Sequence, residues 1–120
     1  MIILGIETSC DETSAAIISD GKLLSNIVST QEIHNKYGGV IPEVASREHE
    51  KNITFIVECA LKKASITKND IDAISFTKGP GLMGALLVGL NFAKGMSLGL
   101  GIPIIGVNHM EGHLYANLIN

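Results

Sequence analysis

Hydrophobic positions along this chain alternate between short runs and longer stretches with a helical period. The short runs, which predict strands, are Ile2–Ile6, Ala15–Ile18, Lys22–Val28, Ile71–Thr77 and Ile104–Val107. The longer stretches, which predict helices, begin at Pro42, at Leu82 and after Asn108. The predicted order of elements is therefore β-β-β-α-β-α-β-α.

Turn residues between these elements indicate how the strands connect. Asp20-Gly21 separates the second run from the third and is typical of a hairpin, so the first three strands should form an antiparallel meander. Two right-handed crossovers then add the fourth and fifth strands. We expect an α/β fold with a five-stranded mixed sheet in the order 3-2-1-4-5, flanking helices, and the first strand beside the fourth.

The helix predicted at Leu82–Leu98 is rich in small residues, among them Gly89 and Ala93, and almost free of charge. Small residues let a helix lie close to a sheet, so we expect a buried helix that ends at Gly99 and Gly101. In such a helix Gly89→Leu would destabilise the fold by overpacking. The uncharged stretch, Gly79–Ala93, is shorter than the ~20 residues that cross a bilayer, which argues against a membrane span.

Polar segments follow four of the predicted strands. If strands one, three, four and five are parallel, these segments leave the same carboxyl edge of the sheet, where ligands bind in open α/β folds. The segments are Ser9–Thr13, His34–Gly39, Lys78–Gly81 and Asn108–His113. In the first of them, the Asp11-Glu12 turn can hold a metal-bound phosphate or can simply be solvated.

Two histidines, His109 and His113, lie four residues apart after the last predicted strand. On a helix both rings would share one face, a spacing that suits a common metal ion but also arises by chance. Met110 stands where zinc proteases have glutamate, and Glu111 suits a helix cap better than a catalytic base. Two imidazoles leave a metal short of ligands, and the sequence offers no obvious third.

Three other features of the sequence each leave two interpretations open. Gly79-Pro80-Gly81 precedes a helix and could bring backbone amides to a phosphate, or could only form a strand-to-helix turn, since it lacks the ending of a P-loop. Arg47 and His49 lie in the first turns of the helix predicted at Pro42. Their side chains could face a cleft at the carboxyl edge of the sheet or could face water. Cys10 has no evident base beside it, which favours a packed thiol over a nucleophile.

The composition of the chain limits which classes of protein it can belong to. The chain has 120 residues, of which 46% are hydrophobic and 18% charged, which fits one folded domain and argues against disorder. A net charge of -3 gives no overall attraction to nucleic acid, so any RNA contact needs a local patch or a partner. Two cysteines make no disulfide framework, and no signal peptide is recognisable, so we expect a cytoplasmic location.

Four segments of the sequence resemble the motifs of one family. They are Gly5–Thr13, Gly38–His49, Lys78–Leu82 and Asn108–His113, and they occur in the family's order over essentially the whole chain. The family is bacterial TsaD, the tRNA threonylcarbamoyladenosine biosynthesis transferases, formerly called O-sialoglycoprotein endopeptidases. The resemblance implies an actin-like (ASKHA, ribonuclease H-like) fold of two lobes, of which residues 1–120 resemble the first.

The resemblance also implies an activity and a site. Members transfer a threonylcarbamoyl group from threonylcarbamoyl-adenylate to the tRNA adenosine next to the anticodon, with TsaB-like and TsaE-like partner proteins. They bind one iron or zinc ion, here through His109 and His113, with an aspartate from the second lobe. By the same resemblance, Asp11 and Glu12 are the catalytic candidates. The candidates for binding the adenylate are Ser9, Cys10, Thr13, Gly79 and Gly81.

Two alternative functions remain. One is a noncatalytic actin-like module that binds or dimerises, against which the intact histidine pair argues. The other is a metalloprotease, which the old name suggests and the position of Glu111 weakens. Because the second lobe is absent, we expect residues 1–120 alone to be inactive.

Overall fold

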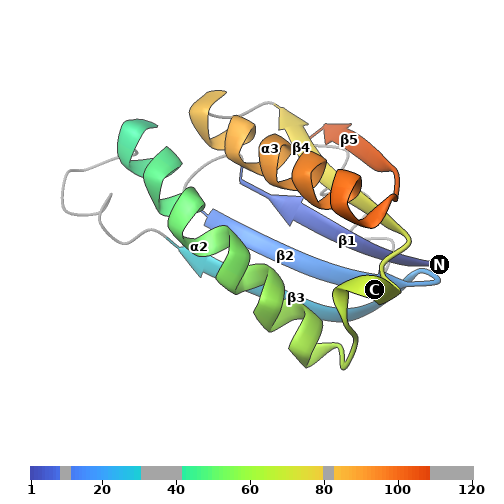
Figure 1. The fold of residues 1–120 in the computed structure, drawn as a ribbon. Helices are drawn as coiled ribbons and strands as arrows, with labels where there is room; N and C mark the ends of the chain where they lie inside the picture. Colours follow the sequence, from blue (N-terminus) through green and yellow to red (C-terminus); the bar gives the residue numbers. More distant parts are fainter. Residues whose placement is uncertain (9–11, 31–41, 80–82, 109–120) are drawn as a thin grey trace.

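The predicted strands form one mixed sheet in the computed structural model, which describes residues 1–8, 12–30, 42–79 and 83–108 (Figure 1). The elements in chain order are β1 (Ile2–Glu7), β2 (Glu12–Ser19), β3 (Lys22–Thr30), α2 (Pro42–Lys63), the 3-10 turn η1 (Lys68–Asp70), β4 (Ala73–Gly79), α3 (Met83–Leu100) and β5 (Ile104–Asn108). The predicted order is confirmed over this part of the chain. The helix predicted after Asn108 falls outside the described residues.

The strand order is β3-β2-β1-β4-β5, as predicted. β1 and β2 are antiparallel, and so are β2 and β3, whereas β1 is parallel to β4 and β4 to β5. The Asp20-Gly21 hairpin is also confirmed, with both residues at positive φ, 50° and 80°. The first strand therefore lies in the middle of the sheet, beside the fourth.

Both helices lie on one face of this sheet, α2 over β2 and β3 and α3 over β1, β4 and β5 (Figure 1). Apolar side chains from the strands and both helices meet between these two layers. They are Leu4, Ile6, Ala15, Ile17, Ile53, Ile56, Val57, Ala60, Ile71, Ile74 and Ala93. The Ser25 hydroxyl, also buried, donates a hydrogen bond of 2.8 Å to the Ala60 carbonyl oxygen and so ties β3 to α2.

Contrary to the prediction of a buried element, α3 is buried along one side only. Ala93 is fully buried and Gly89 lies against the sheet, but Leu87 is 47% and Leu98 85% exposed. The small residues bring one side of the helix close to its neighbours, and its outer side has no other element of the described chain above it. No helix in the described ranges is long and apolar enough to cross a membrane.

Both helices stop next to a residue with left-handed backbone. This residue is Ser65 after α2, with φ 59°, and Gly101 after α3, with φ 69°. Gly99, which the sequence predicts as an end of the helix, lies inside α3. The helix continues to Leu100 because the N–H groups of Gly101 and Ile102 both donate to the Ser97 carbonyl and close the last turn.

The second strand begins earlier than predicted. The apolar pattern starts at Ala15, but β2 begins at Glu12, so Glu12 is a strand residue and not part of a turn. Its polar start is paired on both sides, with Ser14 opposite Glu7 of β1 and Glu12 opposite Thr30 of β3. Backbone pairing with two neighbours thus extends the strand into residues that alone suggest a loop.

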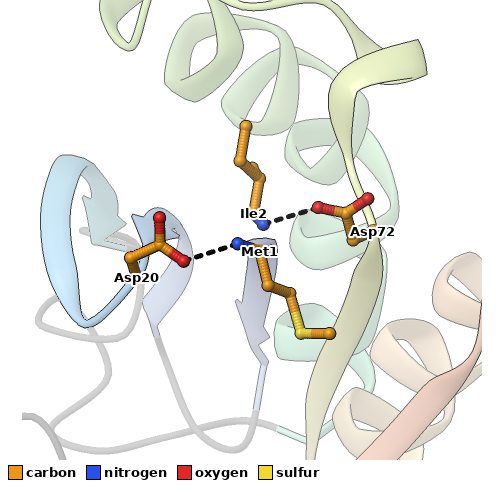
Figure 2. Close-up of polar contacts among 4 residues, drawn as sticks. All are labelled: Met1, Ile2, Asp20 and Asp72. Carbon is orange, nitrogen blue, oxygen red and sulfur yellow. Dashed lines mark hydrogen bonds and ion pairs between the residues drawn. The ribbon is translucent and has the colours of Figure 1, made fainter.

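Two carboxylates accept hydrogen bonds from the backbone nitrogens at the amino-terminal end of β1 (Figure 2). The Met1 ammonium group lies 2.6 Å from Asp20 Oδ1, and the Ile2 amide donates to Asp72 Oδ2 at 2.8 Å. The Asp72 amide in turn donates to the Ile2 carbonyl. This edge lies at the opposite end of the strands from the predicted site, and its contacts join β1 to the hairpin turn and to the start of β4.

Candidate functional site

The carboxyl ends of β1, β4 and β5 lie at one edge of the sheet. These strands are mutually parallel neighbours, and they end at Glu7, Gly79 and Asn108. The segments that follow them carry three of the four motif regions found in the sequence. The structure thus confirms that these segments start from the same edge, whereas the segments themselves fall largely outside the described residues.

Of the predicted site residues, three lie in the described part of the chain. Glu12 is exposed at the first position of β2, Thr13 beside it is buried, and Gly79 is the last residue of β4. The remaining six fall outside the described residues, so their roles stay predictions. They are Ser9, Cys10, Asp11, Gly81, His109 and His113.

A hydrogen bond joins the ends of β1 and β4 at this edge. The Thr77 hydroxyl donates to Glu7 Oε2 over 2.6 Å, in a partly buried position. Since side chains alternate along a strand, Glu7 lies on the sheet face opposite Leu4 and Ile6, which belong to the core beneath the helices. Sequence reasoning missed this pair, although each residue is a polar position at the end of an apolar strand.

The next residue, Thr8, points to the other face of the sheet. It is only 1% exposed, and its Oγ1 lies 2.6 Å from the position that a β-carbon on Gly89 would occupy. Real β-carbons essentially never approach another heavy atom so closely. The absence of a side chain at Gly89 therefore lets α3 pack directly against the point where the chain leaves β1.

The described residues hold no group of three or more His, Cys, Asp or Glu side chains that could bind a metal ion. The predicted ligands His109 and His113 are not among these residues. Within the described part, the edge offers a carboxylate, two hydroxyls and the backbone at Gly79. The Thr77 hydroxyl is already bonded to the Glu7 carboxylate, and that bond keeps the ends of β1 and β4 next to each other.

Residues 22–120 match the model of a protein family described as TsaD, tRNA N6-adenosine threonylcarbamoyltransferase. A protein of that name from Thermosipho africanus is 62% identical over 120 residues, which are 99% of this chain and 36% of the relative. One from Christiangramia forsetii is 58% identical over 117 residues, 98% of this chain and 34% of the relative. The chain thus spans about a third of the length of these curated relatives.

Solved structures with a similar backbone share the fold at low sequence identity. YeaZ from Pseudomonas aeruginosa superposes with a TM-score of 0.70 at 19% identity, over 90% of this chain and 45% of YeaZ. RuvC from T. thermophilus, in complex with a Holliday junction substrate, gives a TM-score of 0.57 at 15% identity, over 92% of this chain and 66% of RuvC. These likenesses confirm the expected actin-like, ribonuclease H-like fold.

Proposed function

The chain belongs to the TsaD family of tRNA N6-adenosine threonylcarbamoyltransferases, and from this premise we propose that residues 1–120 form the first lobe of such a transferase. The family match over residues 22–120 carries the proposal. The proposed reaction moves the threonylcarbamoyl group from threonylcarbamoyl-adenylate to the N6 amine of the tRNA adenosine next to the anticodon.

In the proposed reaction the N6 nitrogen forms a bond to the carbamoyl carbon, and the bond from that carbon to the phosphate oxygen breaks. Adenosine monophosphate leaves with the electron pair, and the N6 nitrogen loses a proton. Asp11 or Glu12 accepts this proton, because a carboxylate within hydrogen-bond reach of an amine can act as a general base. The exposure of Glu12 at the start of β2 is compatible with that role.

Binding of the adenylate is assigned to the two segments that leave β1 and β4. Ser9, Cys10 and Thr13 belong to the first region, and Gly79 and Gly81 provide backbone groups in the second. What supports this assignment is the parallel pairing of β1 and β4, which starts both segments side by side. Backbone amides before a helix are common ligands of phosphate.

His109 and His113 would hold one iron or zinc ion, together with an aspartate from beyond this chain. The donor set fits, since neutral imidazole is a common ligand of both metals and two histidines four apart can share one ion. A bound ion would act as a Lewis acid at the carbamoyl carbonyl or the adenylate phosphate. TsaB-like and TsaE-like partners and a cytoplasmic location, where tRNA is found, belong to the same proposal.

The activity is tested in a completed protein, by which we mean residues 1–120 followed by the remainder of a family member, from the chain's own reading frame or from the Thermosipho africanus relative. Modified adenosine in tRNA is measured by mass spectrometry of nucleosides, with adenylate and partner proteins supplied. We expect Asp11→Asn or Glu12→Gln to abolish most of the transfer. Asp20→Asn, the same kind of change at the amino edge, should leave it intact.

Two results would contradict the activity. Unmodified tRNA with the wild-type completed protein would favour the noncatalytic binding module. Equal transfer by wild type and by both carboxylate variants would remove Asp11 and Glu12 from the mechanism.

The metal is tested separately by elemental analysis of the purified protein. We expect one tightly bound ion per completed protein, its loss in His109→Ala or His113→Ala along with tRNA modification, and weak or absent metal in residues 1–120 alone. Retention of metal and transfer after replacement of both histidines would show the pair to be structural.

A further inference from the structure

The hairpin turn between β2 and β3 is the only Asp-Gly or Asn-Gly pair in the sequence, Asp20-Gly21. We propose that this turn is a site of isoaspartate formation, and that the Met1 ammonium group restrains the reaction. The modification is spontaneous and needs no enzyme. It takes place at the opposite end of the strands from the proposed transferase site, so it does not depend on the proposed function.

The reaction needs only the aspartate, the next backbone nitrogen and water. From the neutral carboxylic acid, the Gly21 nitrogen forms a bond to Cγ of Asp20, and the acid hydroxyl leaves with the proton of that nitrogen as water. The product is a five-membered succinimide ring, which water then opens at either carbonyl carbon. When the bond from the nitrogen to the main-chain carbonyl carbon breaks, the backbone continues through the side chain as isoaspartate.

The folded turn leaves both reacting groups accessible. The Asp20 side chain is 81% exposed. Gly21 has no side chain to shield its nitrogen, and a β-carbon there would meet no heavy atom within 4 Å. Because left-handed backbone is costly for a residue with a β-carbon, Asp20 at φ 50° can leave its conformation at a lower cost than a residue within a strand.

Asp72, the other aspartate in Figure 2, serves as an internal comparison. It is also exposed, and its Oδ2 accepts a hydrogen bond from the Ile2 amide. The residue after it is Ala73, which is buried at the start of β4 and carries a β-carbon beside the backbone nitrogen. Both aspartates therefore contact the same end of β1, but only Asp20 precedes a glycine in an open turn.

Two contacts with Met1 hold Asp20 in place (Figure 2). The Met1 ammonium group donates to Asp20 Oδ1 over 2.6 Å, and the Asp20 amide donates to the Met1 carbonyl over 3.1 Å. Cyclisation requires the side chain to rotate until Cγ reaches the Gly21 nitrogen, and a carboxylate held at one oxygen rotates less freely. Since the ion pair is exposed, its effect on the rate should be modest and should weaken with added salt.

The test follows isoaspartate in the completed protein during long incubation at neutral pH in water labelled with heavy oxygen, by mass spectrometry of its peptides. We expect isoaspartate at Asp20, with labelled oxygen taken up when the ring opens, and none at Asp72. Gly21→Asn adds a β-carbon and still tolerates left-handed backbone. This variant should reduce the modification of Asp20 to the level found at Asp72.

The restraint by Met1 is tested by adding one glycine before it, which replaces the charged amine at that position with an amide. The rate of modification at Asp20 should rise about threefold, the scale of one exposed ion pair. Added salt should raise the rate in the original protein and leave it unchanged in the extended one, because only the original has the ion pair to screen.

A synthetic peptide of residues 17–24 shows how fast the same turn reacts outside the fold. If the peptide forms isoaspartate and the folded protein forms none at Asp20, the turn is closed to the reaction and the proposal fails. Equal modification of Asp20 and Asp72 would also contradict it, since the glycine would then have no influence. An unchanged or lower rate in the extended protein would overturn the restraint by Met1.

Discussion

Among the glycines compared in the described part of the chain, Gly89 leaves the least space for a side chain. A methyl group there would meet Thr8 Oγ1 at 2.6 Å, whereas one at Gly95, in the same helix, would meet nothing within 4 Å. We expect Gly89→Ala to lower stability by about 1–3 kcal/mol, and Gly89→Leu by more, through overpacking. Gly95→Ala is the matched control and should raise stability by about 0.5–1 kcal/mol. Melting temperatures of the variants measure both effects.

The same contact predicts a compensating pair. Without Thr8 Oγ1, the nearest Thr8 atom to a β-carbon at position 89 is Cβ at 3.7 Å, an ordinary contact. The double variant Thr8→Ala/Gly89→Ala should therefore be more stable than the sum of the two single changes predicts, as a double-mutant cycle would show. Strict additivity would mean that the cost at Gly89 comes from elsewhere.

At the other end of β1, the Met1 amine predicts a pH dependence. Its hydrogen bond to Asp20 raises its pKa above the ordinary value of 8.0, with weaker support from the nearby charges of Asp20 and Asp72. A raised pKa in the folded state means that the contact contributes fully below about pH 8 and is lost as the pH rises through the higher value. Asp20→Asn should therefore lower the melting temperature near neutral pH, and the difference from wild type should disappear at alkaline pH. A constant difference across that range would contradict this assignment.

Helix α2 ends in a way that glycine would suit better. Ser65 has φ 59°, and the N–H groups of Ser65 and Ile66 donate to the carbonyls of Lys62 and Leu61, the pattern of a Schellman cap. Since left-handed backbone is costly for residues with a β-carbon, Ser65→Gly should raise the stability by about 1 kcal/mol. Gly101→Ala, at φ 69° after α3, should lower it by a similar amount. Equal melting temperatures for Ser65→Gly and wild type would show that the serine carries no such cost.

Helix α3 shows what composition alone cannot predict. A helix with one charged residue and many small ones predicts a buried element, yet Leu98 is 85% exposed while Ala93 is fully buried. We expect Leu98→Gln to change stability by less than about 0.5 kcal/mol, as an exposed position should. Ala93→Gln, which places a larger polar group in the core, should cost far more. A comparable loss in both variants would show that the outer side of α3 is covered in the folded protein.

The boundaries of strands were the least predictable feature of the elements. Glu12 belongs to β2 because strands on both sides pair with it or with its neighbours, and this pairing comes from segments distant in the sequence. The Glu7–Thr77 hydrogen bond could not be predicted from local sequence patterns either, because it joins residues 70 positions apart. Local patterns predict where strands run, but contacts between strands decide where they end.

The arrangement of the whole molecule was more predictable than its details. The hairpin at Asp20-Gly21 and the right-handed crossovers left few ways to order five strands, and the predicted order is the observed one. The same order puts the ends of β1 and β4 side by side, so the edge at which we propose the site followed from topology. The assignment of Asp11, His109 and His113 rests on the family and remains to be tested by experiment.

The position of β1 in the middle of the sheet has a consequence for synthesis on the ribosome. β2 follows β1 directly and can pair with one edge of β1 as soon as both strands have emerged. The other edge of β1 pairs with β4, which is made much later. The side-chain hydrogen bonds on that side join residues 70 positions apart. Until then the nascent chain presents an open strand edge, the kind of surface through which chains aggregate. A chain stalled before Ala73 would keep that edge open, so binding by a chaperone during translation should be strongest over this interval and end as β4 docks.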